Sequence, residues 1–397
     1  MSVYAYTGQD ADGRRRRGWI EAETPKLARL RLEQQGILTE RLTGAASAAS
    51  LGLEGRARVY RELGVLLRAG FTLERALGLL LDERQTGGPV RGFLAGLRDR
   101  IRDGLPLSRA MAVAEARLPP FERAALQAAE QTGLQGAMLE QLADFIEAQL
   151  AVAGRLRAAL LYPVAVLVLA LTLLSLMMFV VLPRAARVFD QFGDGLPAAT
   201  RRVAVWGPRL LLLLLLAGAA AAVAALWLRQ AARRDARLAA RVERGLLRLP
   251  VARAILPRLW SLRFASTMSL LVQAGVPPQE ALSVASSATG SSWIAMLGTE
   301  AAAAVRQGDS LSSALADLPP LAPHLAEWVR VGESAGNLKE MLDQAAMRCR
   351  QGYEGHLTRL LGLMEPALIL IVGLAVLLIA YTVLKPMLDL ARAAAGG

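Results

Sequence analysis

The chain has 397 residues, a formal net charge of +12 and a hydrophobic fraction of 54%, which is too high for an ordinary soluble protein. The length allows two or three domains. The basic residues are nearly all arginines interleaved with Asp and Glu, without zinc-finger spacing or a recognition-helix pattern, which argues against nucleic-acid binding. We expect solvated helix faces and a basic belt beside anionic lipid instead. The single cysteine, Cys349, excludes a disulfide within the chain.

The first 43 residues predict a small ββα module. Val3–Thr7 alternates like a strand, and Arg16–Glu21 has the composition of the returning strand. Thr24 and Pro25 then predict the start of a helix that ends at Gly36. Residues 44–55 are rich in Ala, Ser and Gly, and we expect a flexible linker there.

An internal repeat dominates the rest of the chain. Arg58–Gly70 aligns with Arg263–Gly275, about 205 residues later. Further matches pair Gly104 with Gly308, Leu107–Ser108 with Leu311–Ser312, Leu118–Pro120 with Leu318–Pro320, Glu130–Gly133 with Glu333–Gly336, and Leu161–Pro163 with Met364–Pro366. The repeat predicts two homologous helical bundles of about six helices each, at residues 56–161 and 250–364.

Glycines punctuate both predicted bundles. In the first copy, the apolar spacing predicts further helices at Val90–Arg102, Leu107–Ala114 and Pro120–Gln131, and another from Met138 onward. Glycines stand where the predicted helices end, and a positive φ at such a position closes the last helical turn. These glycines are Gly70, Gly104 and Gly133 in the first copy, and Gly275, Gly308 and Gly336 in the second.

Three uncharged stretches, Val164–Leu182, Leu210–Leu228 and Pro366–Leu384, are long enough to cross a bilayer. Their length and lack of charge argue against buried core helices. We therefore predict a mainly α, polytopic membrane protein with two bundles, three transmembrane helices and the ββα module. The predicted order after the first bundle is a span at 162–183, a short connection at 184–208, a span at 209–229, a cationic helical extension at 230–249, the second bundle, a span at 365–385 and a tail at 386–397.

The orientation follows from the arginines beside the predicted spans. More of them lie on the side of the two bundles, including Arg155, Arg157 and the run within Arg229–Arg248, than on the opposite side. The positive-inside rule then places both bundles in the cytoplasm and the tail in the periplasm. The first span is expected to act as the insertion signal, because Met1–Arg17 is polar.

Catalysis has little support in the sequence. The two histidines, His324 and His356, lack metal-ligand spacing, and no phosphate-binding loop or nucleophile elbow is present. We predict no enzymatic activity, no cofactor and no metal site. A solute permease is disfavoured because the spans carry no ionisable residue, with Glu365 at the mouth of the third span as the nearest exception. A signalling receptor would need a kinase or cyclase partner that the sequence does not contain.

Two repeated details admit a structural and a functional interpretation. Glu130 and Glu333 each precede a helix-ending glycine by three residues. In the structural interpretation, each side chain faces solvent or accepts a hydrogen bond in the last helical turn. In the functional interpretation, each contacts a partner or a metal ion. Tyr162–Pro163 and Glu365–Pro366 mark where each bundle meets its span. Proline favours a first helical turn, so we expect a defined hinge at both places.

The residues around the first span resemble a known family, the inner-membrane platform proteins of type II secretion and type IV pilus assembly, called the secretion F family. The shared signature comprises Arg155–Leu156, Ala159–Leu160, Tyr162–Pro163, Val166, Ala170, Met177, Val181–Leu182 and Pro183. Tyr4, Tyr6 and Gly13, Glu333–Gly336, Glu365–Pro366 and Leu384–Leu390 also fit. The opening and closing motifs look more like the secretion branch than the pilus branch, which stays the alternative.

The resemblance implies mechanical work without chemistry. It implies that the protein sits in the inner membrane beneath a growing pseudopilus and contacts a hexameric cytoplasmic ATPase. Its further partners would be other inner-membrane secretion components, pseudopilins, membrane lipid and other copies of the same chain. Arg14, Arg15, Arg16 and Arg17 then have two interpretations: a solvated turn, or a surface that steers docking to an acidic partner.

Overall fold

The computed structural model divides the chain into two compact units, which are described separately: Met1–Val152 with Leu247–Tyr353, and Ala153–Leu246 with Glu354–Gly397. The described residues are 2–9, 15–22, 24–34, 36–44, 51–82, 88–115, 118–176, 179–180, 183–184, 235–322 and 324–395, with five single residues between 209 and 220.

The N-terminal module is a three-stranded antiparallel sheet with one helix. Its elements are β1 (Ser2–Gln9), β2 (Arg15–Ala22), α1 (Pro25–Gln34) and β3 (Leu38–Gly44), in the sheet order β2-β1-β3. The hydroxyl of Thr24 accepts a hydrogen bond from the amide of Leu27, which caps α1 as the sequence predicts. The predicted ββα order is therefore incomplete, because a third strand pairs with β1 from the other side. Tyr4, Ala28 and Leu32 form the small core.

Bundle 1 consists of α2 to α6 and the first part of α7. These helices are α2 (Leu53–Arg68), α3 (Leu73–Asp82), α4 (Gly88–Arg102), α5 (Leu107–Ala114), α6 (Pro120–Thr132) and α7 (Gln135–Leu176). The expected linker ends earlier than residue 55, since α2 begins at Leu53 and Leu51 is already buried. Residues 45–50 of that linker lie outside the described residues. The core is mostly aliphatic, with Leu63, Leu77 and Leu139 completely buried.

Bundle 2 repeats this order. Its helices are α11 (Pro250–Gln273), α12 (Pro278–Ala288), α13 (Ser292–Arg306), α14 (Leu311–Ala316), α15 (His324–Ala335) and the first part of α16 (Leu338–Ala395). Leu282, Ile294 and Val329 are fully buried in it. Helix α6 of bundle 1 contacts α11 and α12, so both bundles share one compact unit and one hydrophobic core.

Positive φ angles occur at the predicted helix ends. Gly70, Gly104 and Gly133 have φ values of 87°, 83° and 72°, and Gly275, Gly308 and Gly336 have values of 89°, 109° and 65°. This left-handed conformation lets the chain reverse after each helix at no steric cost to glycine. The helix ends expected from the repeat are thus observed in both copies.

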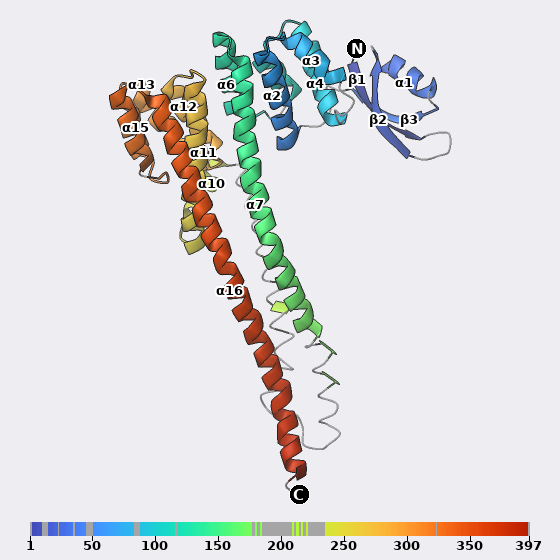
Figure 1. Ribbon diagram of the computed structural model, residues 1–397, viewed down its shortest axis with the longest axis vertical. Helices are drawn as coiled ribbons and strands as arrows, with labels where there is room; N and C mark the ends of the chain where they lie inside the picture. Colours follow the sequence, from blue (N-terminus) through green and yellow to red (C-terminus); the bar gives the residue numbers. More distant parts are fainter. Residues whose placement is uncertain are drawn as a thin grey trace. The chain divides into compact units, whose positions relative to one another are not determined.

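Helices α7 and α16 run without a break past the expected bilayer entry points (Figure 1). Pro163 lies inside α7 and Pro366 lies inside α16, so neither proline occupies a first helical turn. The hinge was expected because proline favours a first helical turn; here each helix instead continues through its proline. Each proline lacks the amide hydrogen for one intrahelical bond, yet the helix extends for several turns on both sides of it.

The predicted cationic extension is described only in part. Helix α10 (Ala236–Leu246) lies within it, and Asp235 caps the start of that helix by accepting a hydrogen bond from the amide of Arg237 at 2.9 Å. Residues 221–234, which would join α10 to the second expected span, lie outside the described residues.

Candidate functional site

The repeated glutamates join two helices within each bundle. Glu130, near the end of α6, accepts hydrogen bonds from the amide and the hydroxyl of Ser108 at 3.0 and 2.5 Å. Glu333, on α15, accepts hydrogen bonds from the amides of Leu311 and Ser312 at 2.6 and 3.1 Å. A carboxylate so placed satisfies orphan amides at a helix start and interacts favourably with the helix dipole. Of the two interpretations from the sequence, the structure supports the hydrogen-bonding one.

The sequence did not predict a buried polar cluster that the structure shows in bundle 1. Tyr60 donates a hydrogen bond to Glu122 at 2.5 Å, and Arg56 forms an ion pair with the same carboxylate at 3.5 Å. Nearby, the buried Glu115 accepts a hydrogen bond from the amide of Leu51 at 2.6 Å. These contacts tie α2 and the chain before it to the α5–α6 region, across more than 60 residues of sequence.

Burial shifts the pKa values of this cluster. Desolvation raises the pKa of Glu122 above its ordinary value, although Arg56 and the hydrogen bond from Tyr60 lower it. Burial, together with the neighbouring Glu122, also holds the pKa of Tyr60 well above its ordinary value. The repeat places Ser261 of bundle 2 opposite Arg56, so the second copy has a hydroxyl where the first has a buried cation.

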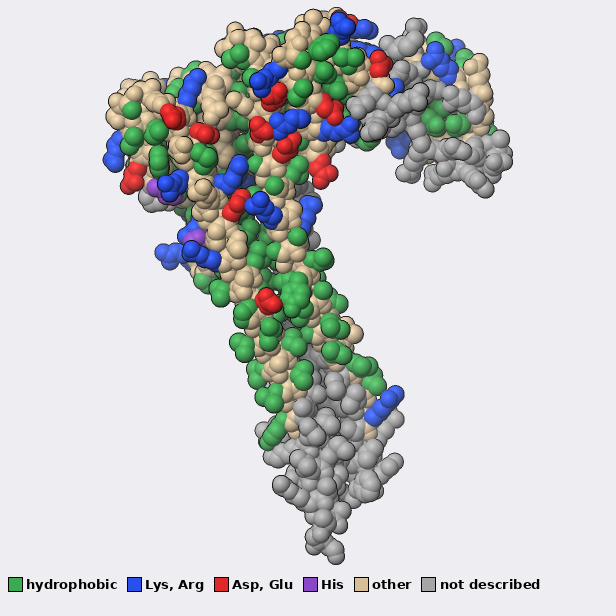
Figure 2. Space-filling view, in the orientation of Figure 1, with side chains coloured by type: hydrophobic (Ala, Val, Ile, Leu, Met, Phe, Trp, Pro, Cys, Tyr) green, Lys and Arg blue, Asp and Glu red, His purple; other side chains and the backbone are tan. Residues whose placement is uncertain are grey.

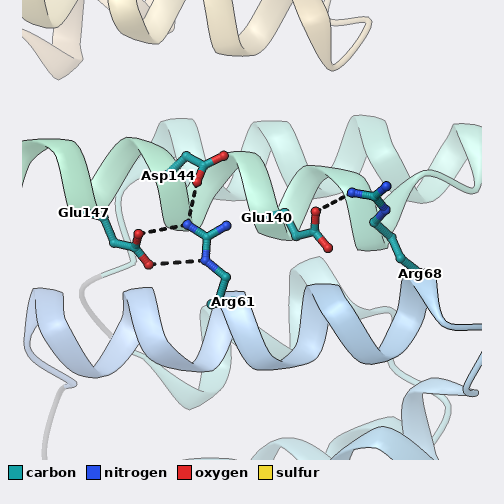
Figure 3. A network of polar contacts seen from close by, with 5 residues as sticks. All are labelled: Arg61, Arg68, Glu140, Asp144 and Glu147. Atoms are coloured by element: carbon teal, nitrogen blue, oxygen red, sulfur yellow. Dashed lines mark hydrogen bonds and ion pairs between the residues drawn. The ribbon is translucent and has the colours of Figure 1, made fainter.

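An ion-pair network joins α2 to α7 on the surface of bundle 1 (Figure 3). Arg61 reaches Asp144 at 2.5 Å and Glu147 at 2.8 Å, and Arg68 reaches Glu140 at 2.5 Å. Most of these side chains are at least one-third exposed, so each pair adds little stability. The repeat places Ser266, Gln273, Asp343, Met347 and Arg350 at the corresponding positions of bundle 2, which rules out the same network there.

The second unit contains the apolar lengths of α7 and α16. In the part of the chain that the structure describes, two helices, Gln135–Leu173 and Leu338–Leu374, are long and apolar enough to cross a membrane. Their hydrophobic side chains gather on the outside, as Figure 2 shows, and Leu161 and Leu370 are each 72% exposed. Such exposure suits contact with lipid or with other membrane helices. Most of the second expected span, Leu210–Leu228, lies outside the described residues.

An ion pair connects these two helices within the same unit. Arg155 of α7 lies 3.3 Å from Glu354 of α16, although 199 residues separate them in the sequence. Arg155 belongs to the family signature found in the sequence, and Glu354 does not. Both side chains are too exposed for the pair to stabilise the fold strongly.

The remaining candidate residues have simple placements. Tyr162 is exposed on α7, and Glu365 is exposed on α16. Pro183 is exposed in a short described helical stretch. Arg14 lies outside the described residues. Arg15, Arg16 and Arg17 lie in the edge strand β2 and not in a turn. Within the described part of the chain, no group of three or more His, Cys, Asp and Glu could hold a metal ion.

Comparisons with known proteins agree with the repeat. The family model "Type II secretion system (T2SS), protein F" matches residues 59–183 and again residues 264–386, and the model of that family's N-terminal domain matches residues 1–39. Type II secretion system protein F of Pseudomonas aeruginosa is 30% identical over 98% of this chain and 99% of that protein. Type 4 fimbrial assembly protein PilC of Pseudomonas putida is 30% identical over 95% of this chain and 94% of that protein. Type IV pilus assembly protein PilC of Thermus thermophilus is 29% identical over 98% of both.

Proposed function

Because the chain belongs to the type II secretion system protein F family, we propose that it is the inner-membrane platform of a type II secretion system. In this role it couples a cytoplasmic ATPase to assembly of the pseudopilus during protein export. The observation that carries the proposal is the repeated family domain, because each copy comprises a helical bundle that continues into a long apolar helix. The matching N-terminal domain extends the relationship to the start of the chain.

The geometry suits mechanical transmission. Helices α7 and α16 each run from a bundle into an apolar segment without a break, so movement of a bundle displaces its helix directly. The hydrogen bonds of Glu130 and Glu333 hold short helices of each bundle together, which favours movement as a body. The protein needs no chemistry of its own in this role, because the ATPase supplies the free energy.

The partners follow from the same role. The cytoplasmic ATPase and other inner-membrane secretion components contact the bundles, and pseudopilins contact the apolar helices. Copies of the chain assemble with one another in the lipid bilayer. Arg14–Arg17 steer docking to an acidic face of the ATPase or of an adaptor, and Arg15, Arg16 and Arg17 of this run lie on the edge strand β2.

Pilus assembly is the alternative, because the fimbrial and pilus relatives are about as similar as the secretion relatives. Deleting the gene from its host distinguishes the secretion role from the pilus role. Loss of exported proteins from the medium with surface pili intact supports the secretion role, and restoration by the wild-type gene is the control. Loss of pili with normal export would assign the chain to the pilus branch.

A further inference from the structure

Helix α10 (Figure 1) has a start of its own within the cationic extension. Asp235, which precedes it, lies outside the helix and accepts hydrogen bonds from the amides of Arg237 and Leu238 at 2.9 and 3.4 Å. A side chain that caps free amides in this way marks the first turn of a helix. The extension therefore contains a separate helix, and the direction of the second expected span does not fix the direction of α10.

An apolar stripe runs along the exposed surface of α10. Leu238, Val242 and Leu246 recur every four residues, which places them on one side of the helix. They are 45%, 37% and 41% exposed. Ala239 and Ala240, on another side, are buried, so the protein covers that side. The apolar stripe therefore faces away from the protein and lacks a cover of its own.

Arginines form a second exposed stripe beside the apolar one. Arg237, Arg241 and Arg244 lie within about 60° of one another around the helix, and about 130° from the apolar stripe. All three are exposed, and so is Arg248, two residues beyond the helix. Arg244 also has an interaction within the chain. In the part of the chain that the structure describes, no ion pair involves Arg237, Arg241 or Arg248.

Few carboxylates oppose these arginines. The sequence from 229 to 248 contains seven arginines but only two acidic residues, Asp235 and Glu243. Asp235 already accepts two amides at the start of the helix, and Glu243 is half-buried with an interaction of its own. The surplus charge on the exposed side of α10 is therefore positive, which is complementary to a surface of lipid phosphates.

Two observations place α10 near the bilayer. Seven residues separate Leu228, the end of the second expected span, from Ala236, so the helix starts within about 30 Å of that end. Helix α10 also belongs to the same compact unit as the apolar lengths of α7 and α16. Bundle 1 is preceded by residues 44–52, which carry no charge, so a bundle of this fold does not require such a helix.

We propose that α10 lies flat on the anionic cytoplasmic leaflet of the membrane, with its apolar stripe among the upper acyl chains and its arginines on lipid phosphates. A helix of this kind combines apolar burial with attraction to anionic lipid. The long arginine side chains reach the phosphates from the flank of the helix. The contact holds the start of bundle 2 at the membrane, whereas bundle 1 lacks this anchor. The proposal rests on the predicted second span, and it holds for either the secretion or the pilus role.

Fluorescence quenching by spin-labelled lipid tests this proposal in the full-length chain, reconstituted in lipid nanodiscs. The probe is a polarity-sensitive fluorophore on Val242→Cys, in a background where Cys349→Ala removes the only native cysteine. The quencher is a lipid with a nitroxide near the top of its acyl chain. The discs contain either phosphatidylglycerol, which is anionic, or phosphatidylcholine, which has no net charge.

Quenching of the probe at Val242 should be about three-fold stronger in the anionic discs than in the neutral discs. A probe on Val331→Cys is the control, because Val331 is 53% exposed on α15 of bundle 2. That probe should be quenched weakly and equally in both kinds of disc.

Two variants separate the contributions of the stripes. Removing charge with Arg237→Gln, Arg241→Gln and Arg248→Gln should reduce quenching in anionic discs to the level in neutral discs. The pair Leu238→Ser and Leu246→Ser should also reduce it, because the helix then loses its apolar contact with the acyl chains.

The matched control removes the same charge elsewhere on the bundles. Its substitutions are Arg109→Gln, Arg306→Gln and Arg330→Gln, at exposed positions of α5, α13 and α15, and they should leave quenching unchanged. Salt at about 1 M shortens the Debye length to about 3 Å and should lower quenching without a change to either stripe.

Equal quenching at Val242 in anionic and neutral discs would overturn the proposal, and so would unchanged quenching in the arginine variant. A probe at Val242 with blue-shifted emission but no quenching by lipid would assign the apolar stripe to contact with protein, which also overturns it. Circular dichroism checks that each variant keeps its helix content. The discs contain no ATPase or pseudopilin, so a negative result would leave the proposed function standing.

Discussion

Glu333 accepts hydrogen bonds from the amides of both Leu311 and Ser312, and the carboxylate thereby holds the start of α14 against α15. Glu130 and Ser108 repeat the arrangement at the start of α5. The two copies differ in the surface ion pairs that join α2 to α7 in bundle 1, yet they keep this link between the same pair of helices. It is the clearest structural counterpart of the Glu-x-x-Gly pattern in the sequence.

Replacing Glu333 by Ala should lower the stability of the protein by about 1 kcal/mol, because two amides at the start of α14 lose their acceptor. Thermal unfolding in detergent, followed by circular dichroism, measures the change. Glu327→Ala on the same helix is the control, since Glu327 is exposed and should tolerate the change. Equal melting temperatures for both variants would show that the link does not stabilise the bundle.

Replacing Gly275 by Ala should cost about 1 kcal/mol, because a Cβ is strained at a φ of 89°. No neighbouring atom lies within 4 Å of such a Cβ, so the cost comes from the backbone alone. Gly78→Ala is the matched control, since Gly78 lies within α3 with equally open space. That change should raise stability by about 0.5 to 1 kcal/mol. Melting temperatures that move in the same direction for both variants would contradict this account.

Stability should depend on pH through Glu122. Because burial raises the pKa of Glu122 in the folded state, the folded protein keeps a proton there that the unfolded chain has lost. Between the ordinary carboxyl pKa and the raised pKa, stability therefore falls as the pH rises. Glu122→Gln keeps an acceptor for Tyr60 and should flatten this slope, whereas Glu327→Gln should not. Parallel slopes for wild type and Glu122→Gln, from melting curves across that pH range, would argue against a raised pKa.

The predicted topology places the C-terminal tail in the periplasm. Alkaline phosphatase is active only in the periplasm, so its fusion after Arg392 should be active, and a fusion after Gly52 should be inactive. Enzyme activity in whole cells, normalised to fusion protein on immunoblots, measures both. An inactive fusion after Arg392 would mean that the orientation is reversed or that one of the three expected spans does not cross.

Local features of this fold could be predicted from the sequence. The positive φ at Gly70 and Gly275 follows from their place at helix ends, and α5 begins and ends at the predicted residues, Leu107 and Ala114. The unbroken course of α7 past Pro163 could not be predicted, because the proline preference is local whereas the helix on both sides is long enough to tolerate one lost bond.

The features that the sequence did not predict depend on contacts between residues far apart in the chain. Strand β3 was missed because its pairing with β1 joins residues 29 to 40 positions apart, from Gln9 with Leu38 to Tyr4 with Gly44, and a single strand pattern does not reveal its partner. The contact between Tyr60 and Glu122 spans 62 residues. Nothing in the sequence around Glu122 distinguishes a buried glutamate from a solvated one.

The central claim, that the bundles transmit the work of a cytoplasmic ATPase, is tested most directly by site-specific photocrosslinking in intact membranes. Exposed positions on each bundle, including Val113 and Val331, would carry the crosslinker, and Arg392 in the tail would be the control position. The account predicts that the secretion ATPase crosslinks to bundle positions and not to the tail. Export that continues normally while no bundle position crosslinks to the ATPase would contradict it.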